Sequence, residues 1–532
     1  MSARALNHWG WGWADRFPDR PTRELLGAQL GAVLGFTPGE LADPVALADA
    51  DVAPSMLAPP ALLAEIITDA RDARARRTYG RSYRDLVRGF RGDFGSAPDL
   101  VATPRDEADV VALLDWASGA NVAVIPFGGG TSVVGGVERS DRERPVLVLD
   151  LANLDAVLEV ERTSLSARIQ AGIFGPALET TLGQHGLTLR HFPQSFEFST
   201  LGGWIATRAG GHFATLYTHI DDLVQTTRTV TPRGVLETRR FPSSGAGPSA
   251  DRLMLGSEGT LGVITEAWMR VRPRPRFRAT ASVHFAKFRG AVSAVHALSQ
   301  SGLYPTNCRL LDPREAALNF VATDGSSVVV VGFESADHGL AVWIERALEL
   351  CRDHGGVCAK GAVIREGGER TGDDGVAGSW KQAFFEAPYL QSTMVSIGVI
   401  ADTFETACTW DHFEALHQAI THDVRDALRR VAGKGSLSCR FTHVYPDGPA
   451  PYYTFLAPAK RGSELAQWAE IKSAASEALA RAGGTITHHH GVGRTHRPWY
   501  EREAPAPFLG MLRAAKREVD PAGIMNPGCL LA

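Results

Sequence analysis

The sequence lacks the cysteine pattern of a secreted or zinc-stabilised protein. Its six cysteines are spread singly through 532 residues, without a CxxC pair or the spacing of a zinc site. They predict buried, reduced thiols and favour a reducing compartment. Residues Met1 to Trp13 contain no apolar run typical of a secretory signal, so we expect none and predict a cytoplasmic protein.

Long hydrophobic runs and an excess of one charge are also missing. No segment approaches the ~20 consecutive apolar residues of a membrane-spanning helix. The 55 basic and 59 acidic side chains give a formal net charge of −4, which gives no reason to expect nucleic acid or an anionic membrane as a partner. We expect a small-molecule partner. Peripheral membrane contact stays open, because a lipid ligand needs no spanning helix.

What the sequence does have is ordinary globular composition, 44% hydrophobic and 21% charged, over a length that exceeds one core. Residues 1–96 are predicted to form a helical region, with helical spacing from Leu62 to Arg77. An α+β unit is expected at 97–275, ending where prolines and charges mark a boundary. A second α+β unit is expected at 276–500, and residues 501–532 should pack back on the first.

Strands and helices alternate irregularly in both units, which predicts an α+β fold rather than a regular βαβ series. The expected strands are Val122–Pro126, Val146–Asp150, Ala156–Glu161, Leu165–Ala171, Ser327–Phe333, Met394–Ala401, Arg440–Tyr445 and Pro451–Phe455. The expected helices are Asp106–Gly119, Phe174–His185, His338–His354, Thr409–Arg430 and Pro505–Pro521.

Three consecutive glycines, Gly128 to Gly130, follow the first of these strands and precede Thr131 and Ser132. Glycine lets backbone N–H groups approach an anion without obstruction by a Cβ atom. A pyrophosphate site is one interpretation, and a plain tight turn is the other. The segment is no Walker loop, because no GK[ST] follows, and no Rossmann fingerprint, because the GxGxxG spacing is absent.

Two further segments rich in glycine and hydroxyl side chains lie in the same unit, at His191–Gly211 and Gly256–Ile264. Three such segments in this order are more specific than any one alone. They resemble the FAD-binding domain of the vanillyl-alcohol-oxidase/p-cresol-methylhydroxylase (PCMH) superfamily. Over nearly the whole chain, the sequence is most similar to the alkyl-dihydroxyacetonephosphate synthase family within it. The motifs that carry this resemblance are His8–Trp13, Pro126–Ser132, Glu197–Trp204, Glu258–Ile264, Arg309–Asp312 and Thr487–Gly493.

The resemblance implies a two-subdomain FAD-binding domain of PCMH type at 97–275, an α+β cap domain at 276–500 and a homodimer. Some members attach FAD through a His or Cys near the first loop, and Gly128–Gly130 offers neither, so non-covalent FAD is expected. The residues that would bind FAD are Pro126, Phe127, Gly128, Gly129, Gly130, Thr131, Ser132, Gln194, Ser195, Phe196, Glu197, Phe198, Ser199, Thr200, Gly203, Thr207, Arg208, Ala209, Gly210, Glu258, Gly259, Thr260, Leu261, Gly262, Val263 and Ile264.

Three adjacent histidines, His488, His489 and His490, precede a Gly-Val-Gly sequence. Neighbouring side chains point apart on a strand or helix, so such a run rarely chelates one ion, and no metal is expected. A surface stretch is the alternative, against which the flanking glycines and apolar residues argue. The resemblance places the run at the active site, where a histidine titrating near neutrality suits a general acid or base.

The resemblance also assigns catalytic roles to Tyr453, His191 and Arg309. Tyr453 would be an acid or base, and the alternative is a half-buried strand tyrosine whose neighbour Tyr452 faces the other way. Arg309 would hold an anionic substrate or reduced flavin, and the alternative is a structural salt bridge with Asp312.

The sequence departs from the synthase pattern at the expected substrate phosphate. Gln391 stands where the family has an arginine, and glutamine offers no charged fork to a phosphate. Arg370 or Lys381 are alternative cations. We therefore expect an FAD-dependent oxidoreductase that acts on a hydroxyl-bearing or related small molecule. Hydride would pass to flavin N5, with tyrosine and histidine handling protons.

Two other functions are compatible with the sequence. One is the synthase reaction, in which a flavin adduct exchanges an acyl chain for an alcohol without net redox, as a step of ether-lipid synthesis. The other is an inactive FAD-binding scaffold, against which retention of Tyr453, His191, Arg309 and the histidine run argues.

Overall fold

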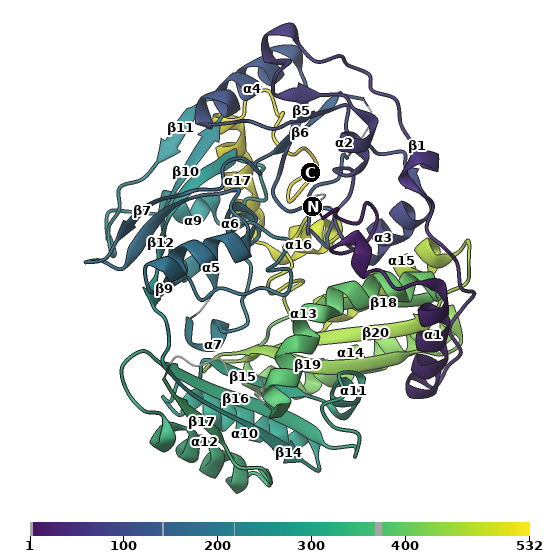
Figure 1. Ribbon diagram of the computed structural model, residues 1–532, viewed down its shortest axis with the longest axis vertical. Helices are drawn as coiled ribbons and strands as arrows, with labels where there is room; N and C mark the ends of the chain where they lie inside the picture. The colour runs from purple at the N-terminus through teal and green to yellow at the C-terminus, as the bar shows by residue number, and fades with distance from the viewer. Residues whose placement is uncertain (1–3, 141–142, 218, 368–374) are drawn as a thin grey trace.

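The computed structural model of the protein describes residues 4–140, 143–217, 219–367 and 375–532, and only the backbone of residues 375–385. Two α+β units lie one above the other in Figure 1, with the longest sheet in the lower one. Both chain ends lie in the upper unit. The expected α+β class is confirmed. In the described part of the chain, no helix has both the length and the apolar character needed to cross a membrane.

The upper unit begins with a four-stranded sheet of order β2-β4-β6-β5. Its strands are Ile67–Thr68, Leu100–Ala102, Val146–Asp150 and Ala123–Phe127, and the last three run parallel. Helix α4 (Glu107–Ala120) makes the crossover; Asp106 caps its start and Asn121, with φ 53°, ends it. Strand β5 is apolar because it is buried, and it delivers the chain directly into the glycine segment.

A five-stranded antiparallel sheet of order β11-β10-β12-β8-β7 completes the upper unit. Its strands are Gly234–Glu237, Val224–Thr231, Val263–Arg270, Ser166–Gln170 and Val157–Glu161. Helices α5 (Gly175–Gln184) and α6 (Leu201–Thr207) pack their apolar residues on β8 and β12. This packing fixes the second glycine-rich segment, which contains α6.

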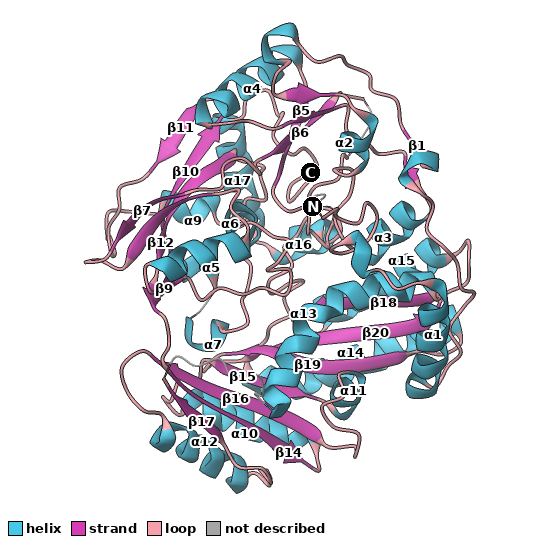
Figure 2. Ribbon diagram, viewed as in Figure 1, coloured by secondary structure: helices cyan, strands magenta, loops and turns pink. Residues whose placement is uncertain are grey.

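The lower unit is built on a seven-stranded antiparallel sheet of order β17-β14-β16-β15-β19-β20-β18. The strands are Val363–Glu366, Phe277–Phe285, Ser327–Ser335, Asn307–Leu311, Ser436–Val444, Pro449–Pro458 and Val399–Glu405. Helices α10 (Phe288–Gln300), α12 (Ala341–Asp353), α14 (Trp410–Ala432) and α15 (Glu464–Arg481) bury one face of it. Figure 2 shows the first three of these helices behind the strands.

Helices α11 (Pro313–Leu318) and α13 (Gly375–Ser396) lie on the other side of that sheet, with α13 at the junction of the two units (Figure 1). Helix α1 (Arg20–Leu34) packs beside α13 and β18 through Leu30 and Leu34. Smaller elements are β1 (Asp51–Val52), α2 (Arg71–Ala75), α3 (Tyr83–Phe90), β3 (Asp93–Phe94), β9 (Leu187–Thr188), α7 (Ala214–Tyr217), α8 (Ile220–Leu223), α9 (Ala250–Met254), β13 (Arg272–Pro273) and α16 (Arg497–Glu503).

Two sequence predictions are wrong at the level of elements. Leu62–Arg77 is not one helix, because Ile67–Thr68 forms β2 and pairs with β4, which separates a 3-10 turn at Ala61–Leu63 from the short α-helix at Arg71–Ala75. Met394–Ala401 is not one strand, because α13 continues to Ser396 and Gly398, at φ 71°, turns the chain into β18. In both places, one run of apolar residues is divided between two short elements that follow each other along the chain.

The C-terminal segment returns to the upper unit. After α17 (Ala506–Val519), Met525 forms a parallel bridge with Val124 of β5. The amide of Val124 donates to Ile524 at 2.8 Å, and the amide of Asn526 donates to Val124 at 2.8 Å. The last residues therefore extend the four-stranded sheet at the strand that leads to the glycine segment.

Candidate active site

One cavity of about 370 Å³ lies between the two units, and the three glycine-rich segments meet at it. The predicted FAD-binding residues that line it are Pro126, Phe127, Gly128, Gly129, Gly130, Thr131, Ser132, Gln194, Ser195, Ser199, Thr200, Gly203, Thr207, Ala209, Gly210, Glu258, Gly259, Gly262 and Ile264. Most of this wall is backbone or hydroxyl groups, the donor set that suits a pyrophosphate. The residues present therefore fit FAD.

Glycine is required in the first segment because it packs against the second. A Cβ atom at Gly129 would lie 1.7 Å from the carbonyl oxygen of Phe198, and one at Gly128 would lie 2.2 Å from Thr200 Oγ1. No side chain fits in either place. The close contact holds the two backbone segments together along one wall of the cavity.

Seven predicted FAD-binding residues do not line the cavity: Phe196, Glu197, Phe198, Arg208, Thr260, Leu261 and Val263. Three of them, Phe196 to Phe198, are consecutive residues of one turn. Glu197 instead accepts hydrogen bonds from Trp13 Nε1 at 2.6 Å and from Tyr389 at 3.3 Å. Arg208 ends α6 in the left-handed region, at φ 53°, and pairs with Asp221 at 2.6 Å. These residues support the wall of the cavity from behind.

Glu258 connects the upper unit to the loop that follows the histidine run. Its buried carboxylate accepts hydrogen bonds from the amides of Val492 and Gly493, both at 2.7 Å. Burial raises the pKa of Glu258, while these amide bonds oppose the rise. Glu258 is thus a bridge between the glycine wall and the histidine loop.

The opposite wall of the cavity is one face of the seven-stranded sheet. Arg309, Arg440, Thr442, Tyr452 and Thr454 line the cavity from β15, β19 and β20. Residues between them, such as Phe441 and Phe455, enter the core under α14. The period of two along each strand explains the division.

The structure corrects the position of the predicted catalytic tyrosine. Tyr453 faces the core, where its ring stacks on Phe404 at 4.9 Å and its hydroxyl bonds His417 Nδ1 at 3.0 Å. Tyr452, its neighbour on β20, lines the cavity. Side chains of neighbouring residues on a strand face opposite sides, so only one of these two tyrosines reaches the cavity.

Tyr452 lies between a cation and a hydroxyl. Its own hydroxyl donates to Thr403 Oγ1 at 2.9 Å, and the Arg440 guanidinium lies 4.0 Å above its ring. Burial raises the pKa of Tyr452 to about 12, although Arg440 opposes that rise. Arg440 itself pairs with Glu315 at 2.7 Å. At neutral pH, Tyr452 is therefore a protonated phenol.

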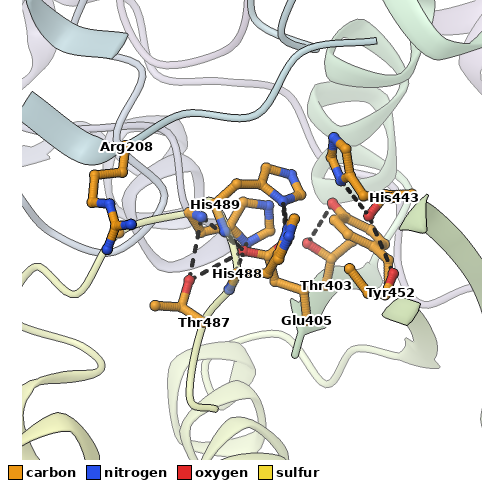
Figure 3. Close-up of polar contacts among 12 residues, drawn as sticks. Arg208, Thr403, Glu405, His443, Tyr452, Thr487, His488 and His489 are labelled. Atoms are coloured by element: carbon orange, nitrogen blue, oxygen red, sulfur yellow. Dashed lines mark hydrogen bonds and ion pairs between the residues drawn. The ribbon is translucent and has the colours of Figure 1, made fainter. Parts of the chain in front are cut away.

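Glu405 organises the histidine run, as Figure 3 shows. Its Oε1 accepts the backbone amides of His488 at 3.1 Å and of His489 and His490 at 2.7 Å. Its Oε2 lies 2.5 Å from His489 Nδ1. Burial would raise the pKa of Glu405, but the imidazoles of His489 and His490 hold it well below its usual value. The loop is thus wrapped around a buried carboxylate.

The three histidines of the run point in different directions. His489 and His490 line the cavity, and burial lowers the pKa of His490 to about 3. His488 points toward His443, another residue of the cavity wall, and its ring centre lies 4.8 Å from that of His443. Burial lowers the pKa of His488 and of His443 well below the usual value, so both imidazoles are neutral at neutral pH.

His191 and Arg309 have different positions. His191 is buried behind the cavity, with its ring 5.0 Å from Trp204, and burial lowers its pKa to about 3. Arg309 lines the cavity and donates to Asn307 Oδ1 at 3.2 Å and to the His212 carbonyl at 3.3 Å. Burial lowers the pKa of Arg309 to about 9.

The alternative role for Arg309, a salt bridge with Asp312, is not what the structure shows. Asp312 caps α11 by accepting the amide of Glu315 at 2.7 Å, and it also accepts the amide of Cys439 at 2.8 Å. Arg309 and Asp312 therefore have different hydrogen-bond partners.

Gln391 lines the cavity, but its amide is used by the protein. Its Oε1 accepts from Trp11 Nε1 at 2.9 Å, and its Nε2 donates to the Ala401 carbonyl at 3.0 Å. Of the alternative cations, Arg370 lies outside the described residues, and the side chain of Lys381 is not among those described.

The cavity has an apolar end away from the glycine segments. Leu30, Leu318, Leu390, Met394 and Leu456 line it from α1, α11, α13 and β20. Sequence reasoning missed this end, and also Tyr452, Arg440, His443 and Glu405. The alternation of apolar and polar residues in β19 and β20 was a usable signal for Tyr452 and Arg440, provided that the register was known. It was no signal for His443, because the strand has an irregularity between Phe441 and His443.

Two family profiles match the chain. "FAD binding domain" matches residues 98–239, and "FAD linked oxidases, C-terminal domain" matches residues 274–530. Alkyldihydroxyacetonephosphate synthase of Dictyostelium discoideum is 33% identical and covers 88% of this chain and 79% of its own. The synthase of Trypanosoma brucei brucei is 30% identical, with 86% and 78% covered. A glycolate oxidase subunit of Bacillus subtilis is 25% identical, with 82% and 90% covered.

The comparison with solved structures also finds an alkyldihydroxyacetonephosphate synthase. An alkyldihydroxyacetonephosphate synthase structure superposes with a TM-score of 0.82 at 26% identity over 98% of both chains. The 4-ethylphenol oxidase of Gulosibacter chungangensis, at 15% identity and a TM-score of 0.65, covers 88% of this chain and 94% of its own, and shows the shared fold alone. The protein is thus an FAD-dependent enzyme. It belongs to the alkyldihydroxyacetonephosphate synthase family, within the vanillyl-alcohol-oxidase/p-cresol-methylhydroxylase superfamily.

Proposed function

We propose that the enzyme exchanges an acyl chain for an alkyl chain without net redox. This function differs from the oxidoreductase that we expected from the sequence. An acyl chain esterified to a dihydroxyacetone-type head group would leave as a fatty acid, and a long-chain alcohol would take its place as an ether. The relatives at 30–33% identity support this reaction. FAD, held without a covalent link, would supply the chemistry at the reacting carbon.

The apolar end of the cavity is the observation that carries the proposal. A small hydroxy acid would leave the cavity-facing surface of Leu30, Leu318, Met394 and Leu456 uncovered by ligand. A long acyl or alkyl chain would cover them, with roughly 0.8 kcal/mol of stabilisation for each buried CH₂ group. The chain would lie between α1, α11 and α13, with its polar end toward the glycine wall.

We assign the proton chemistry to the sheet wall. Tyr452, a protonated phenol, can donate to an oxygen of the substrate, and it is oriented by Thr403 and Arg440. His489, paired with Glu405, can take the proton that the alcohol loses. Arg309 would orient the head group as a buried cation.

The head group is where this chain would differ from its relatives. Because Trp11 and Ala401 occupy the amide of Gln391, that residue offers little to a phosphate. We therefore expect the phosphate to contribute less to affinity than the acyl chain does.

A second candidate is oxidation of a hydroxyl-bearing small molecule. The profile of the FAD-linked oxidases over residues 274–530 and the uncharged side chain at Gln391 favour it. In that reaction His489 and Tyr452 would handle the proton of the hydroxyl group, and the cavity would not need its apolar end.

The test uses the purified, flavin-containing protein without oxygen. Palmitoyl-dihydroxyacetonephosphate and palmitoyl-dihydroxyacetone are each added with hexadecanol, and both free palmitate and the ether product are quantified. Equal amounts of palmitate and ether support the exchange, and the ratio of the two rates measures the role of the phosphate. Lasting reduction of the flavin by simple hydroxy acids, without ether formation, would overturn it in favour of oxidation.

A further inference from the structure

Three histidines from distant parts of the chain converge beside the cavity. His219 precedes α8, His443 lies on β19, and His488 begins the histidine run. One ring nitrogen of each lies within 4.8 Å of the other two. The ring centres are 5.3 Å apart for His219 and His443, 4.7 Å for His219 and His488, and 4.8 Å for His443 and His488.

The remaining ring nitrogens face partners outside this cluster. His219 Nδ1 lies 3.5 Å from the Arg208 carbonyl, and His443 Nε2 lies 3.1 Å from the Gly211 carbonyl. The other nitrogen of His443, Nδ1, lies 3.1 Å from the Thr442 hydroxyl, which the ion would displace. His488 Nδ1 lies 3.0 Å from His489 Nδ1, the atom that pairs with Glu405. For His219 and His443 this partner is a backbone carbonyl, which metal-binding histidines often use to fix the ring and the tautomer.

Tyr445 places an oxygen within the cluster. Its hydroxyl lies 2.6 Å from His219 Nε2 and 2.8 Å from His488 Nε2. A hydroxyl has one proton, so it can donate to only one of these nitrogens. The arrangement brings three imidazoles and one oxygen together, which matches the number and type of ligands in a four-coordinate zinc site.

We propose that His219, His443 and His488 bind one divalent first-row ion of the zinc, cobalt or nickel class, with the Tyr445 hydroxyl or a water as the fourth ligand. This site is additional to the proposed function and does not depend on it. Imidazole suits these ions better than magnesium or calcium, which prefer oxygen ligands.

The ion would lie directly behind the glycine wall of the cavity. A Cβ atom at Gly210, which lines the cavity, would be 3.0 Å from His443 Cε1 and 3.2 Å from His219 Cε1. The absence of a side chain at Gly210 is what lets the two rings approach this wall. An ion here would fix His443 in the wall and connect the two units.

A second group, Glu405, His489 and His490, also brings three donor atoms together. Its carboxylate is already used, because Oε1 accepts three backbone amides and Oε2 pairs with His489. The run therefore contributes only His488 to the proposed site, because neighbouring side chains diverge. The expectation of no metal rested on the run alone and did not include His219 and His443.

The test measures zinc on the flavin-containing enzyme. The protein is dialysed against a chelator, titrated with Zn²⁺ by calorimetry, and analysed for bound metal by mass spectrometry. We expect one equivalent of zinc. His219→Asn should lower the affinity at least roughly tenfold with the flavin content unchanged. His412→Asn, an exposed histidine on α14, is the matched control and should bind zinc as the wild type does.

Two further measurements decide the assignment. His490→Asn removes a member of the second group and should keep the zinc; loss of zinc there, with retention in His219→Asn, overturns the proposal. Co²⁺ added to the wild type should give absorption bands at longer wavelength than the flavin, typical of four-coordinate cobalt. Absence of these bands together with no bound zinc also overturns it, whether or not a variant folds.

Discussion

The two walls of the cavity are built in different ways. The upper wall consists of backbone from three continuous segments, in which glycines at 128, 129, 210 and 259 bring main chain close to the cavity. The lower wall consists mainly of side chains from β15, β18, β19 and β20, together with one loop held by Glu405. A wall of backbone is visible in the sequence as runs of glycine, whereas a wall of side chains depends on register and on distant residues.

The two walls also differ in what they would do. The upper wall fits a cofactor that is common to a large superfamily. The lower wall contains the titratable groups, Tyr452, His489 and His490, and leads to the apolar end. Substitutions should therefore separate cofactor binding from turnover, and the following predictions test that separation.

The largest effect of a substitution is expected at the glycine wall, the upper wall of the cavity. Gly129→Ala should abolish FAD binding, because its Cβ atom would lie 1.7 Å from the Phe198 carbonyl and force the two segments apart. The visible spectrum and the flavin-to-protein ratio of the purified variant measure this. Gly245→Ala, where a Cβ atom has no neighbour within 4 Å, is the control. A fully flavin-loaded Gly129→Ala protein would show that the wall is not required in this form.

At the side-chain wall, Tyr452→Phe should keep FAD and lower turnover by about 10²–10⁴, as expected for loss of a general acid or base. Tyr453→Phe should leave turnover unchanged and lower the free energy of unfolding by ~1 kcal/mol, because only the hydrogen bond to His417 is lost. Rate measurements and denaturant unfolding on both variants test the comparison. The reverse pattern would restore the sequence-based assignment of Tyr453.

A smaller effect is expected at the apolar end. Met394→Trp should fill the space between α1 and α13 and raise KM for a hexadecanoyl substrate by roughly tenfold, a change of about 1.4 kcal/mol, while a decanoyl substrate is little affected. Leu25→Trp, on the exposed side of α1, is the control for added bulk. Equal effects on the two chain lengths would mean that the acyl chain lies elsewhere.

The smallest effect concerns the pH dependence of stability. The pKa of His490 is lowered by burial to about 3, so in the folded protein it resists protonation that the unfolded chain accepts below about 6.5. Stability should therefore fall as the pH decreases through this range, by up to ~1.4 kcal/mol per pH unit for this one group. Denaturant unfolding of His490→Asn between about pH 6.5 and pH 5 should show a shallower slope.

His338→Asn, at an exposed position, is the control for the loss of an imidazole as such. An unchanged slope in His490→Asn would show that His490 is not the group that resists protonation. Working above pH 5 keeps the measurement clear of Glu405, whose pKa is held well below 4.5 and whose contribution to stability is lost only in stronger acid.

The sequence predicted helices and strands well where a single hydrophobic pattern spans one whole helix or strand. Helix α4 was predicted at Asp106–Gly119 and runs from Glu107 to Ala120, so each end differs by one residue. Prediction was wrong at Met394–Ala401, where a single apolar run covers the end of a helix, a glycine turn and the start of a strand. Hydrophobicity alone does not distinguish these, because all of them are buried.

The site was predicted in the same uneven way. Most of the glycine wall was named residue by residue, because its glycine and hydroxyl residues stand together in short motifs of the sequence. Tyr452 was missed because a shift of one residue along β20 exchanges the side chains that face the cavity for those that face the core. Glu405 was missed because it lies far in sequence from the histidines that it holds. Register and long-range electrostatics are properties of the folded chain, and a single sequence reports them poorly.

The pairing of Met525 with Val124 has a consequence for synthesis on the ribosome. The strand that leads into the glycine wall gains its last neighbour only when residues 524–526 have emerged, after both units have been made. The upper unit is therefore interrupted by the entire lower unit in the order of translation. The strand that leads into the glycine wall therefore reaches its final pairing only after the lower unit has left the ribosome.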